Sequence, residues 1–378
     1  MIWVGFIIIS LYFFAIALLC IGYKMVPYFS VVGSVPETKF SIVIPFRNEA
    51  ENLSALARSL QQLHYPTSHF ELIFVNDASE DNSEDIIIQH LKGSSIDFQI
   101  LQNTPNQLSP KKTAITKAIS IAKHPWIVTT DADCEVPTHW LRILNDFILK
   151  TEPVCVAMPV DYTTNNSFLH LYQQLDNWSL QAVTVGSFGL GAMLLSNGAN
   201  FAYTKDTFKS VNGFEGNLHI ASGDDMFLLE KLKRRFPEKI GYLKSRNAVV
   251  TTKPVETWKQ LISQRIRWAS KTAKQNSAAT KALGLLVFVV NILIPLSILL
   301  TIFCPQHSNA VGALLLYKFC IDFLLLWKSA QFFRKRFPFF SFLSLLGSMF
   351  VYPIVTILVV ISSFWGRYVW KGRRFEKL

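Results

Sequence analysis

The sequence has few cysteines, and none of them lies in a pattern typical of a disulfide framework or a metal site. The 5 cysteines form no C-x-x-C pair, and the 8 histidines form no H-x-H or H-E-x-x-H cluster. This spacing argues against a disulfide-stabilised secreted domain and a structural zinc site, and it favours a reducing compartment. The chain also has no internal repeat and no low-complexity segment.

Acidic residues are also scarce. Only 26 Asp and Glu oppose 37 Lys and Arg, which gives a net charge of +11. Nucleic acid is a common partner for a basic chain. Here, however, the basic residues flank long apolar segments, where the positive-inside rule of membrane proteins accounts for them. We therefore expect a membrane partner and no nucleic acid.

Hydrophobic residues make up 50% of the chain and concentrate at its two ends. The segment Ile2–Tyr23 is uncharged and long enough for one bilayer crossing. It has no basic n-region and no A-x-A cleavage site, so we expect an uncleaved anchor rather than a signal peptide. Further apolar stretches cover Leu283–Phe303, Ala310–Phe333 and Phe337–Trp365, and basic residues follow the last two, including Arg334–Arg336.

Between these ends, short apolar runs alternate with helical patterns. The sequence predicts strands over Phe40–Pro45, Glu71–Val75, Asp97–Leu101 and Trp126–Thr130. Strands alternating with helices of this length indicate βαβ units and a mostly parallel sheet. Ligands bind at the carboxyl ends of the strands in such sheets. Asn48, Asp77 and Asp131 follow predicted strands directly, so one crevice can collect all three.

The segment Ile127–Val136 reads IVTTDADCEV and places Asp131 and Asp133 just after a predicted buried strand. Residues i and i+2 of an extended segment point the same way. Two carboxylates held so are suitable ligands for Mg²⁺ or Mn²⁺, which also bind phosphate oxygens and water. The alternative is an ordinary surface turn, where Asp is common.

The second half of the soluble region is less regular. Gly223-Asp224-Asp225 opens a predicted helix that ends near Arg235, and a second helical pattern begins at Val255. Apolar residues line one side of that second helix, and the opposite side carries Gln264, Arg267, Trp268 and Lys271.

With these motifs in order, the chain resembles the family 2 glycosyltransferases, membrane-attached enzymes with a GT-A fold. The resemblance covers roughly residues 40–268. In chain order it is carried by IVIPFRNE with Asn48 and Glu49, VNDAS with Asp77, PKKTA with Lys111, DAD with Asp131 and Asp133, GDD ending at Asp225, and Q-x-x-R-W at Gln264, Arg267 and Trp268.

The resemblance implies an α/β fold, with a Rossmann-like and mostly parallel sheet, between N- and C-terminal transmembrane helices. We divide the chain accordingly into a membrane anchor (1–23), a GT-A catalytic domain (39–253), an amphipathic interface helix (254–280), a C-terminal transmembrane region (281–366) and a basic tail (367–378).

The resemblance also implies roles on the donor side of the site. Asp77 is expected to hold the uracil or ribose of a UDP-sugar, and Glu49 either makes a second nucleoside contact or is a plain first-turn acid. Lys111 is placed to meet the diphosphate, although Lys112 could take that part. Asp133 resembles the metal ligand proper, for Mg²⁺ or Mn²⁺, with Asp131 as a further ligand or nearer the sugar.

On the acceptor side, Gln264, Arg267 and Trp268 resemble the element that closes over the diphosphate and acceptor. Asp225 aligns with the catalytic base. The family's usual T-E-D is Gly223-Asp224-Asp225 here. This departure leaves Asp224 as the alternative proton acceptor.

The expected function is inverting, metal-dependent transfer of a sugar from a UDP-sugar to a lipid or amphiphilic hydroxyl at the cytoplasmic face of the cell membrane. The alternatives are a processive polysaccharide synthase and a non-catalytic membrane subunit that keeps the fold. With the catalytic domain and the basic tail both cytoplasmic, Phe337–Trp365 is expected to be a re-entrant hairpin bent near Gly347–Pro353, or to lie partly in the interface. A plain fourth span is the simpler reading of its length.

Overall fold

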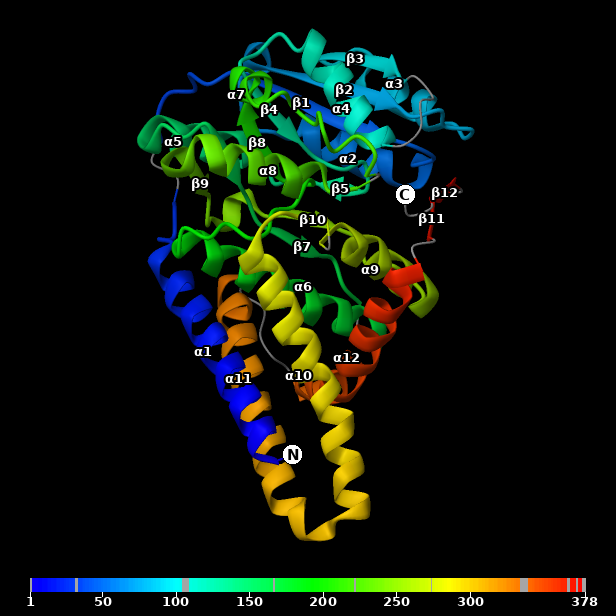
Figure 1. The fold of residues 1–378 in the computed structure, drawn as a ribbon. Helices are drawn as coiled ribbons and strands as arrows, with labels where there is room; N and C mark the ends of the chain where they lie inside the picture. The colour runs from blue at the N-terminus through cyan, green and yellow to red at the C-terminus, as the bar shows by residue number, and fades with distance from the viewer. Residues whose placement is uncertain are drawn as a thin grey trace.

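The computed structural model of the chain describes residues 2–30, 33–103, 109–165, 167–220, 222–272, 274–333, 339–365, 368–371 and 373–375. A layered α/β part stands above a group of long helices that come from both ends of the chain (Figure 1). The predicted basic cluster Arg334–Arg336 lies outside the described residues.

A seven-stranded sheet with the order β3-β2-β1-β4-β8-β6-β9 forms the centre of the α/β part. Strands β1, β2, β3 and β4 are parallel, and β8 runs antiparallel to both of its neighbours. The mostly parallel sheet is therefore confirmed. Its strands are β1 (Phe40–Phe46), β2 (Phe70–Asn76), β3 (Asp97–Gln102), β4 (Trp126–Thr129), β6 (Cys155–Ala157), β8 (Phe201–Thr204) and β9 (Ile240–Tyr242).

Helices cover both faces of the sheet because the strands are apolar on both sides. In β1, Ile42 and Ile44 pack into one hydrophobic core, and Val43 packs into the other. Helices α2 (Ala50–Gln61), α3 (Ser83–Leu91) and α5 (Trp140–Thr151) supply the first core, and α4 (Pro110–Ile121), α7 (Lys205–Ser210) and α8 (Asp224–Arg235) supply the second. Short 3-10 turns cover Thr67–His69, Pro237–Lys239, Arg246–Ala248 and Pro305–His307.

A small sheet lies on the side of the α/β part that faces the long helices (Figure 1). It has the order β5-β10-β7, with β5 at Cys134–Glu135, β10 at Val250–Thr252 and β7 at Val160–Tyr162. Strand β5 follows the predicted metal-binding aspartates, and β10 leads into α9 (Trp258–Thr272). The small sheet therefore brings the D-x-D segment close to the start of α9.

Helix α6 (Phe168–Gly189) is a 22-residue helix that the sequence pattern did not reveal. Ser167 caps its first turn by accepting a hydrogen bond from the His170 backbone N–H at 3.3 Å. Buried polar side chains, among them Gln173, Asn177 and Gln181, interrupt its apolar periodicity. Because α6 packs against α1, α11 and α12, it connects the α/β part to the long helices.

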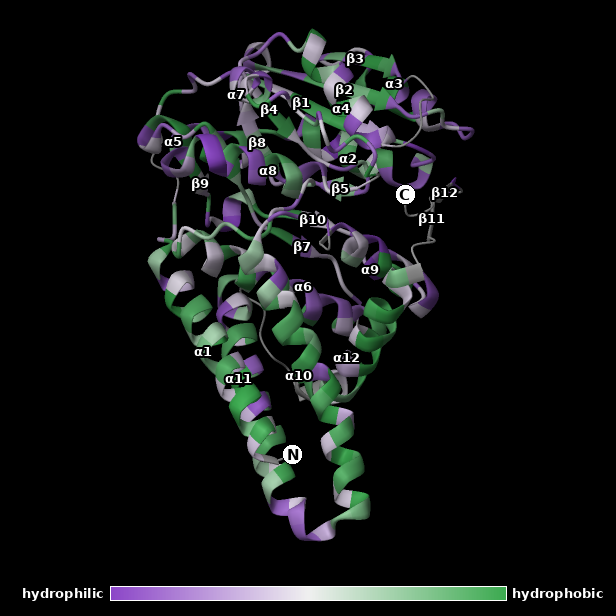
Figure 2. Cartoon of the chain, viewed as in Figure 1, coloured by the Kyte–Doolittle hydropathy of each residue, from purple (hydrophilic) through white to green (hydrophobic). Residues whose placement is uncertain are grey.

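Within the described part of the chain, four helices are long and apolar enough to cross a membrane. They are α1 (Ile2–Met25), α10 (Ala278–Phe303), α11 (Ser308–Phe333) and α12 (Phe339–Trp365). Figure 2 shows that hydrophobic residues dominate these helices, whereas hydrophilic residues are spread over the α/β part. The predicted spans at both ends of the chain are therefore present as helices.

The predicted re-entrant hairpin is wrong, because α12 is one continuous helix through Gly347 and Pro353. Its middle lies against α6, where the Tyr352 and Tyr172 rings are 6.4 Å apart, and it continues along α9. The hairpin of β11 (Tyr368–Trp370) and β12 (Arg373–Phe375) then lies beside the α/β part (Figure 1). The side of the membrane on which the α/β part and this hairpin lie stays a prediction.

Glycines bring the backbones of α1 and α6 into close contact. A Cβ atom on Gly186 would lie 2.4 Å from the Leu19 carbonyl oxygen, and one on Gly22 would lie 2.1 Å from the Gly186 carbonyl oxygen. Small residues permit this approach between apolar helices.

The substitution Gly186→Ala is expected to destabilise the protein by about 1–3 kcal/mol, because the added methyl meets backbone that cannot rotate away. Gly312→Ala in α11 is the matched control, since its Cβ would have no atom within 4 Å. Thermal unfolding in detergent measures both. A Gly186→Ala protein that melts like Gly312→Ala would contradict the close crossing.

Candidate active site

The turn after β4 carries Asp131 and Asp133, and both side chains line a cavity of about 410 Å³. The turn is fixed to the sheet because the Thr130 backbone N–H donates to the Val43 carbonyl at 3.2 Å. Asp131 and Asp133 therefore project from the carboxyl end of β4, where a parallel sheet places its ligands.

Lys111 lies in the first turn of α4 and reaches the same cavity. Its Nζ is 2.6 Å from Asp131 Oδ1 and 3.3 Å from Asp224 Oδ2. Burial opposes its charge, but the carboxylates of Asp131 and Asp224 outweigh burial and raise the pKa of Lys111. Lys111 is therefore a fixed cation beside two acids.

Lys112, the sequence alternative to Lys111, donates to backbone carbonyls instead. Its side chain is fully buried, and its Nζ donates to the carbonyls of Asn217 and Ile220, each at 2.8 Å. Burial lowers the pKa of Lys112 to about 8. Of the two lysines, only Lys111 lines the cavity, and Lys112 fixes the loop before α8.

The surroundings of Asp133 disfavour a negative charge. Burial, then the charges of Asp131 and Glu49, raise the pKa of Asp133 to about 6. A divalent cation at this point would offset the repulsion, so the residues fit the predicted metal. Among the described residues no three His, Cys, Asp or Glu side chains could hold an ion together. Phosphate and water would therefore have to complete the ligand set.

Asp224 and Asp225 begin α8 and differ in their environments. Burial favours the neutral form of Asp224, but Lys111, Lys271 and Lys112 outweigh burial and lower its pKa. Burial also acts on Asp225, where Lys271 opposes it and the charge of Asp224 reinforces it, so the pKa of Asp225 is raised. Asp225 accepts hydrogen bonds from the Gly198 N–H at 3.1 Å and the Met226 N–H at 2.7 Å. Asp225 is thus the more basic of the two adjacent carboxylates.

Helix α9 closes the opposite side of the cavity. Gln264, Arg267 and Trp268 all line it. Lys271, one turn further along the helix, places its Nζ 3.8 Å from Asp225 Oδ1. The sequence analysis put Lys271 on the same helix face but assigned it no part.

The sequence analysis missed the ion pair that fixes α9. Arg265 is buried, and its guanidinium lies 2.6 Å from Asp176 of α6 and 4.1 Å from the centre of the Trp268 ring. The Q-x-x-R-W spacing gives no sign that the residue after Gln264 turns inward. Through its contacts with Asp176 and the Trp268 ring, Arg265 holds Trp268 in place.

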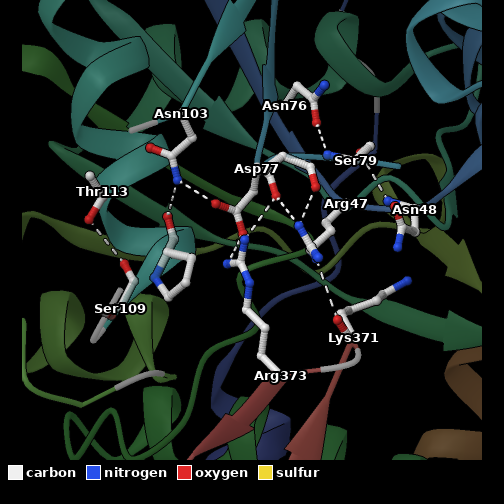
Figure 3. Close-up of polar contacts among 12 residues, drawn as sticks. Arg47, Asn48, Asn76, Asp77, Ser79, Asn103, Ser109, Thr113, Lys371 and Arg373 are labelled. Carbon is white, nitrogen blue, oxygen red and sulfur yellow. Dashed lines mark hydrogen bonds and ion pairs between the residues drawn. The ribbon is translucent and has the colours of Figure 1, made fainter. Parts of the chain in front are cut away.

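Glu49 and Asp77 do not line the cavity and form a neighbouring site at the ends of β1 and β2. Figure 3 shows Asp77 between Asn103 and Arg373. Asn103 donates to Asp77 Oδ1 at 2.8 Å, and Arg373 pairs with Asp77 Oδ2 at 2.6 Å. Glu49 pairs with Lys371 at 2.6 Å. The sequence analysis saw Lys371 and Arg373 only as basic flanks of an apolar stretch.

The predicted residues therefore form two adjoining groups. Lys111, Asp131, Asp133, Asp225, Gln264, Arg267 and Trp268 line one cavity, and Glu49 and Asp77 lie beside it. An acid pair, fixed lysines and an element that covers them form a site suited to an anionic, phosphate-bearing substrate.

Residues 41–209 match the family model described as Glycosyl transferase family 2. Over these residues the chain matches a family 2 glycosyltransferase. The match begins at the second residue of β1 and ends in α7, so it includes the D-x-D turn. The family that the ordered motifs resemble is thus confirmed.

Curated relatives match over parts of the chain. A probable glycosyltransferase, YdaM of Bacillus subtilis, is 24% identical over 243 residues, which are 61% of this chain and 54% of that protein. A beta-monoglucosyldiacylglycerol synthase of Trichormus variabilis is 27% identical over 29% of this chain and 23% of its own length. An undecaprenyl-phosphate 4-deoxy-4-formamido-L-arabinose transferase of Photorhabdus laumondii is 34% identical over 26% of this chain and 30% of its own. The chain thus spans about half, or less, of each relative.

Among solved structures, a mannosyltransferase from Pyrobaculum calidifontis in complex with GDP-Man and Mn²⁺ superposes with a TM-score of 0.56. The sequences are 14% identical, and the superposition covers 96% of each chain. The likeness supports the GT-A fold.

Replacement of Arg265 by Ala is expected to lower the free energy of unfolding by about 3–5 kcal/mol, because it leaves Asp176 as an unpaired buried charge. Arg234→Ala is the control. Its side chain is 63% exposed and pairs with Glu230, and such exposed pairs contribute about 0.5 kcal/mol. Chemical denaturation compares the two variants. Equal stability of both would show that Arg265 does not hold α9.

Proposed function

We propose that this chain is an inverting, metal-dependent glycosyltransferase that moves a sugar from a UDP-sugar to a lipid or amphiphilic hydroxyl. The observation that carries the proposal is the shared cavity. Asp131, Asp133, Lys111 and Asp225 line it, and the Q-x-x-R-W element closes it. These groups provide in one place the charges that a departing nucleoside diphosphate and an attacking hydroxyl require.

On the donor side, the carboxylates of Asp133 and Asp131 would hold Mg²⁺ or Mn²⁺ together with the diphosphate oxygens. The ion supplies Lewis-acid stabilisation of the leaving group when bound. Lys111 adds a permanent positive charge, because two acids keep it protonated. Asp77 and Glu49 would bind the nucleoside at the neighbouring strand ends. Gln264, Arg267 and Trp268 would exclude water from the diphosphate.

On the acceptor side, a second cavity of about 290 Å³ supports a lipid substrate. It lies among α1, α6, α10, α11 and α12, and most of its lining is apolar. Tyr172, Asp176, Leu180, Leu195 and Tyr352 line both cavities, so the two adjoin. A lipid among the helices would then present its polar end to the catalytic cavity.

The second cavity also has polar side chains at its lining. Tyr12 donates to Asp322 at 2.7 Å, and Lys318 forms an ion pair with the same carboxylate. Polar groups placed among apolar helices commonly mark a substrate path. Two of the curated relatives carry the names of enzymes that act on lipids, which agrees with this acceptor class.

For the transfer itself, we assign proton removal to Asp225. Asp225 is buried and its pKa is raised, whereas nearby lysines lower the pKa of Asp224. Asp225 therefore accepts a proton more readily than Asp224. Asp225 would take the acceptor hydroxyl proton while the oxygen attacks the anomeric carbon. A single displacement of this kind, with UDP as the leaving group, inverts the configuration at the anomeric carbon.

The site belongs at the cytoplasmic face of the cell membrane, because UDP-sugars are cytoplasmic. In this arrangement α1 enters, α10 leaves and α11 returns. Because the hairpin after α12 stays beside the catalytic domain, α12 would not cross the membrane. A processive polysaccharide synthase is disfavoured by the apolar lining of the second cavity. A non-catalytic subunit is disfavoured by the intact acids.

A donor panel tests the function. Full-length protein in membranes receives Mn²⁺ and radiolabelled UDP-sugars, with GDP-mannose as a further donor. We expect label from one UDP-sugar to enter the lipid extract as a single-sugar product, with release of UDP. Label in a long polymer would instead indicate a synthase. A protein that releases no nucleotide from any donor would overturn the enzymatic proposal.

Asp133→Asn is expected to abolish transfer and to weaken UDP binding in the presence of Mn²⁺, because the cation loses one of few protein ligands. Binding measured with and without Mn²⁺ separates the metal from the nucleotide. If the variant binds UDP with Mn²⁺ as tightly as the parent, the D-x-D segment is only a turn.

Asp225→Asn is expected to slow transfer by about 10²–10⁴-fold, with donor binding nearly unchanged, because an amide cannot accept the proton. Asp224→Asn is the matched comparison and should slow transfer less than Asp225→Asn does. It loses the contact with Lys111, so its effect should fall partly on donor affinity. Turnover and UDP affinity are measured for both. An inactive Asp224→Asn beside an active Asp225→Asn would move the base to the other carboxylate.

A further inference from the structure

The β11–β12 hairpin binds the acids that the proposed function reserves for the donor nucleoside. Arg373 places Nη1 2.6 Å from Asp77 Oδ2, and its Nη2 donates to the Asp77 backbone carbonyl at 3.2 Å. Lys371 places Nζ 2.6 Å from Glu49 Oε1. The hairpin is thus fixed at two strand ends that lie about 300 residues earlier in the chain.

These contacts take up part of the hydrogen-bonding capacity that a nucleoside would use. Asp77 Oδ1 accepts from Asn103 at 2.8 Å, so the ion pair with Arg373 occupies its second oxygen. Glu49 accepts from Asn52 through Oε2 at 2.7 Å and from Lys371 through Oε1. The side chains of Asp77 and Glu49 are 8% and 9% exposed, so little of either is open to solvent.

The hairpin is also attached through its backbone. Arg47, which follows β1, donates to the Lys371 carbonyl at 3.4 Å and to the Asp77 carbonyl at 2.8 Å (Figure 3). The same residue thereby contacts the nucleoside site and the hairpin turn. A nucleoside that takes the position of the Arg373 guanidinium at Asp77 Oδ2 must displace it.

We propose that the β11–β12 hairpin is an autoinhibitory strap that competes with the donor nucleotide for Asp77 and Glu49. The proposal rests on the proposed function, because it takes those two acids as the nucleoside contacts. Arg373 and Lys371 supply the positive charge that keeps the acids paired when no donor is bound. A nucleotide binds only when these two side chains leave.

The competition predicts the sign of a change in nucleotide affinity. A site that is open for only a fraction of the time shows an apparent Kd increased by the inverse of that fraction. If the strap is closed about nine-tenths of the time, loss of its two ion pairs tightens UDP binding about tenfold.

The test measures equilibrium binding of UDP with Mn²⁺ to full-length protein in detergent. The double variant Lys371→Ala/Arg373→Ala should bind UDP more tightly than the parent. Lys123→Ala/Arg234→Ala is the control, because it removes the same charge from two side chains that are 57% and 63% exposed. Unchanged or weaker binding by the strap variant would overturn the proposal, and weaker binding would identify its two cations as donor ligands.

Hydrogen exchange of residues 368–375 provides a second readout that does not depend on catalysis. The hairpin amides should be protected in the parent, and both UDP and the Asp77→Asn substitution should remove that protection. UDP that binds without exposing the hairpin would overturn the strap alone. No UDP binding by the parent or by any variant would instead overturn the proposed function, and the strap with it.

Discussion

Negative charges held away from water are the constraint on which this structure depends. Parallel strands end at one edge of the sheet, and there the chain gathers Glu49, Asp77, Asp133, Asp224 and Asp225, most of them buried. Buried carboxylates persist only with positive partners or with a proton. Each of these acids has a positive partner or a raised pKa. Lysines pair with Asp224, Asp225 and Glu49, an arginine pairs with Asp77, and the pKa of Asp133 is raised.

The membrane helices are fixed to this edge through α6. Its glycines meet α1, its Asp176 binds Arg265 of α9, and its Tyr172 contacts α12. The catalytic cavity and the apolar cavity therefore share a wall. Under the proposed function, a lipid acceptor would not have to leave the membrane, because its hydroxyl could be presented from among the helices.

The sequence predicted what local patterns determine. Apolar runs bounded by turn residues located β1 to β4, and the D-x-D and Q-x-x-R-W spacings located most of the cavity. Helix α6 escaped because buried Gln173, Asn177 and Gln181 break its apolar stripe. The partners of Asp77 and Glu49 escaped because basic residues beside an apolar span are expected in any membrane protein. Only the folded chain shows that two of them return across about 300 residues.

The central claim is that these acids form a donor site in which a nucleotide replaces the protein's own cations. A structure of the full chain with UDP and Mn²⁺ tests it most directly. We predict the nucleoside at Asp77 in place of Arg373, and the diphosphate between Lys111 and an ion held by Asp133. A nucleotide bound elsewhere, with Arg373 still on Asp77, would contradict the account.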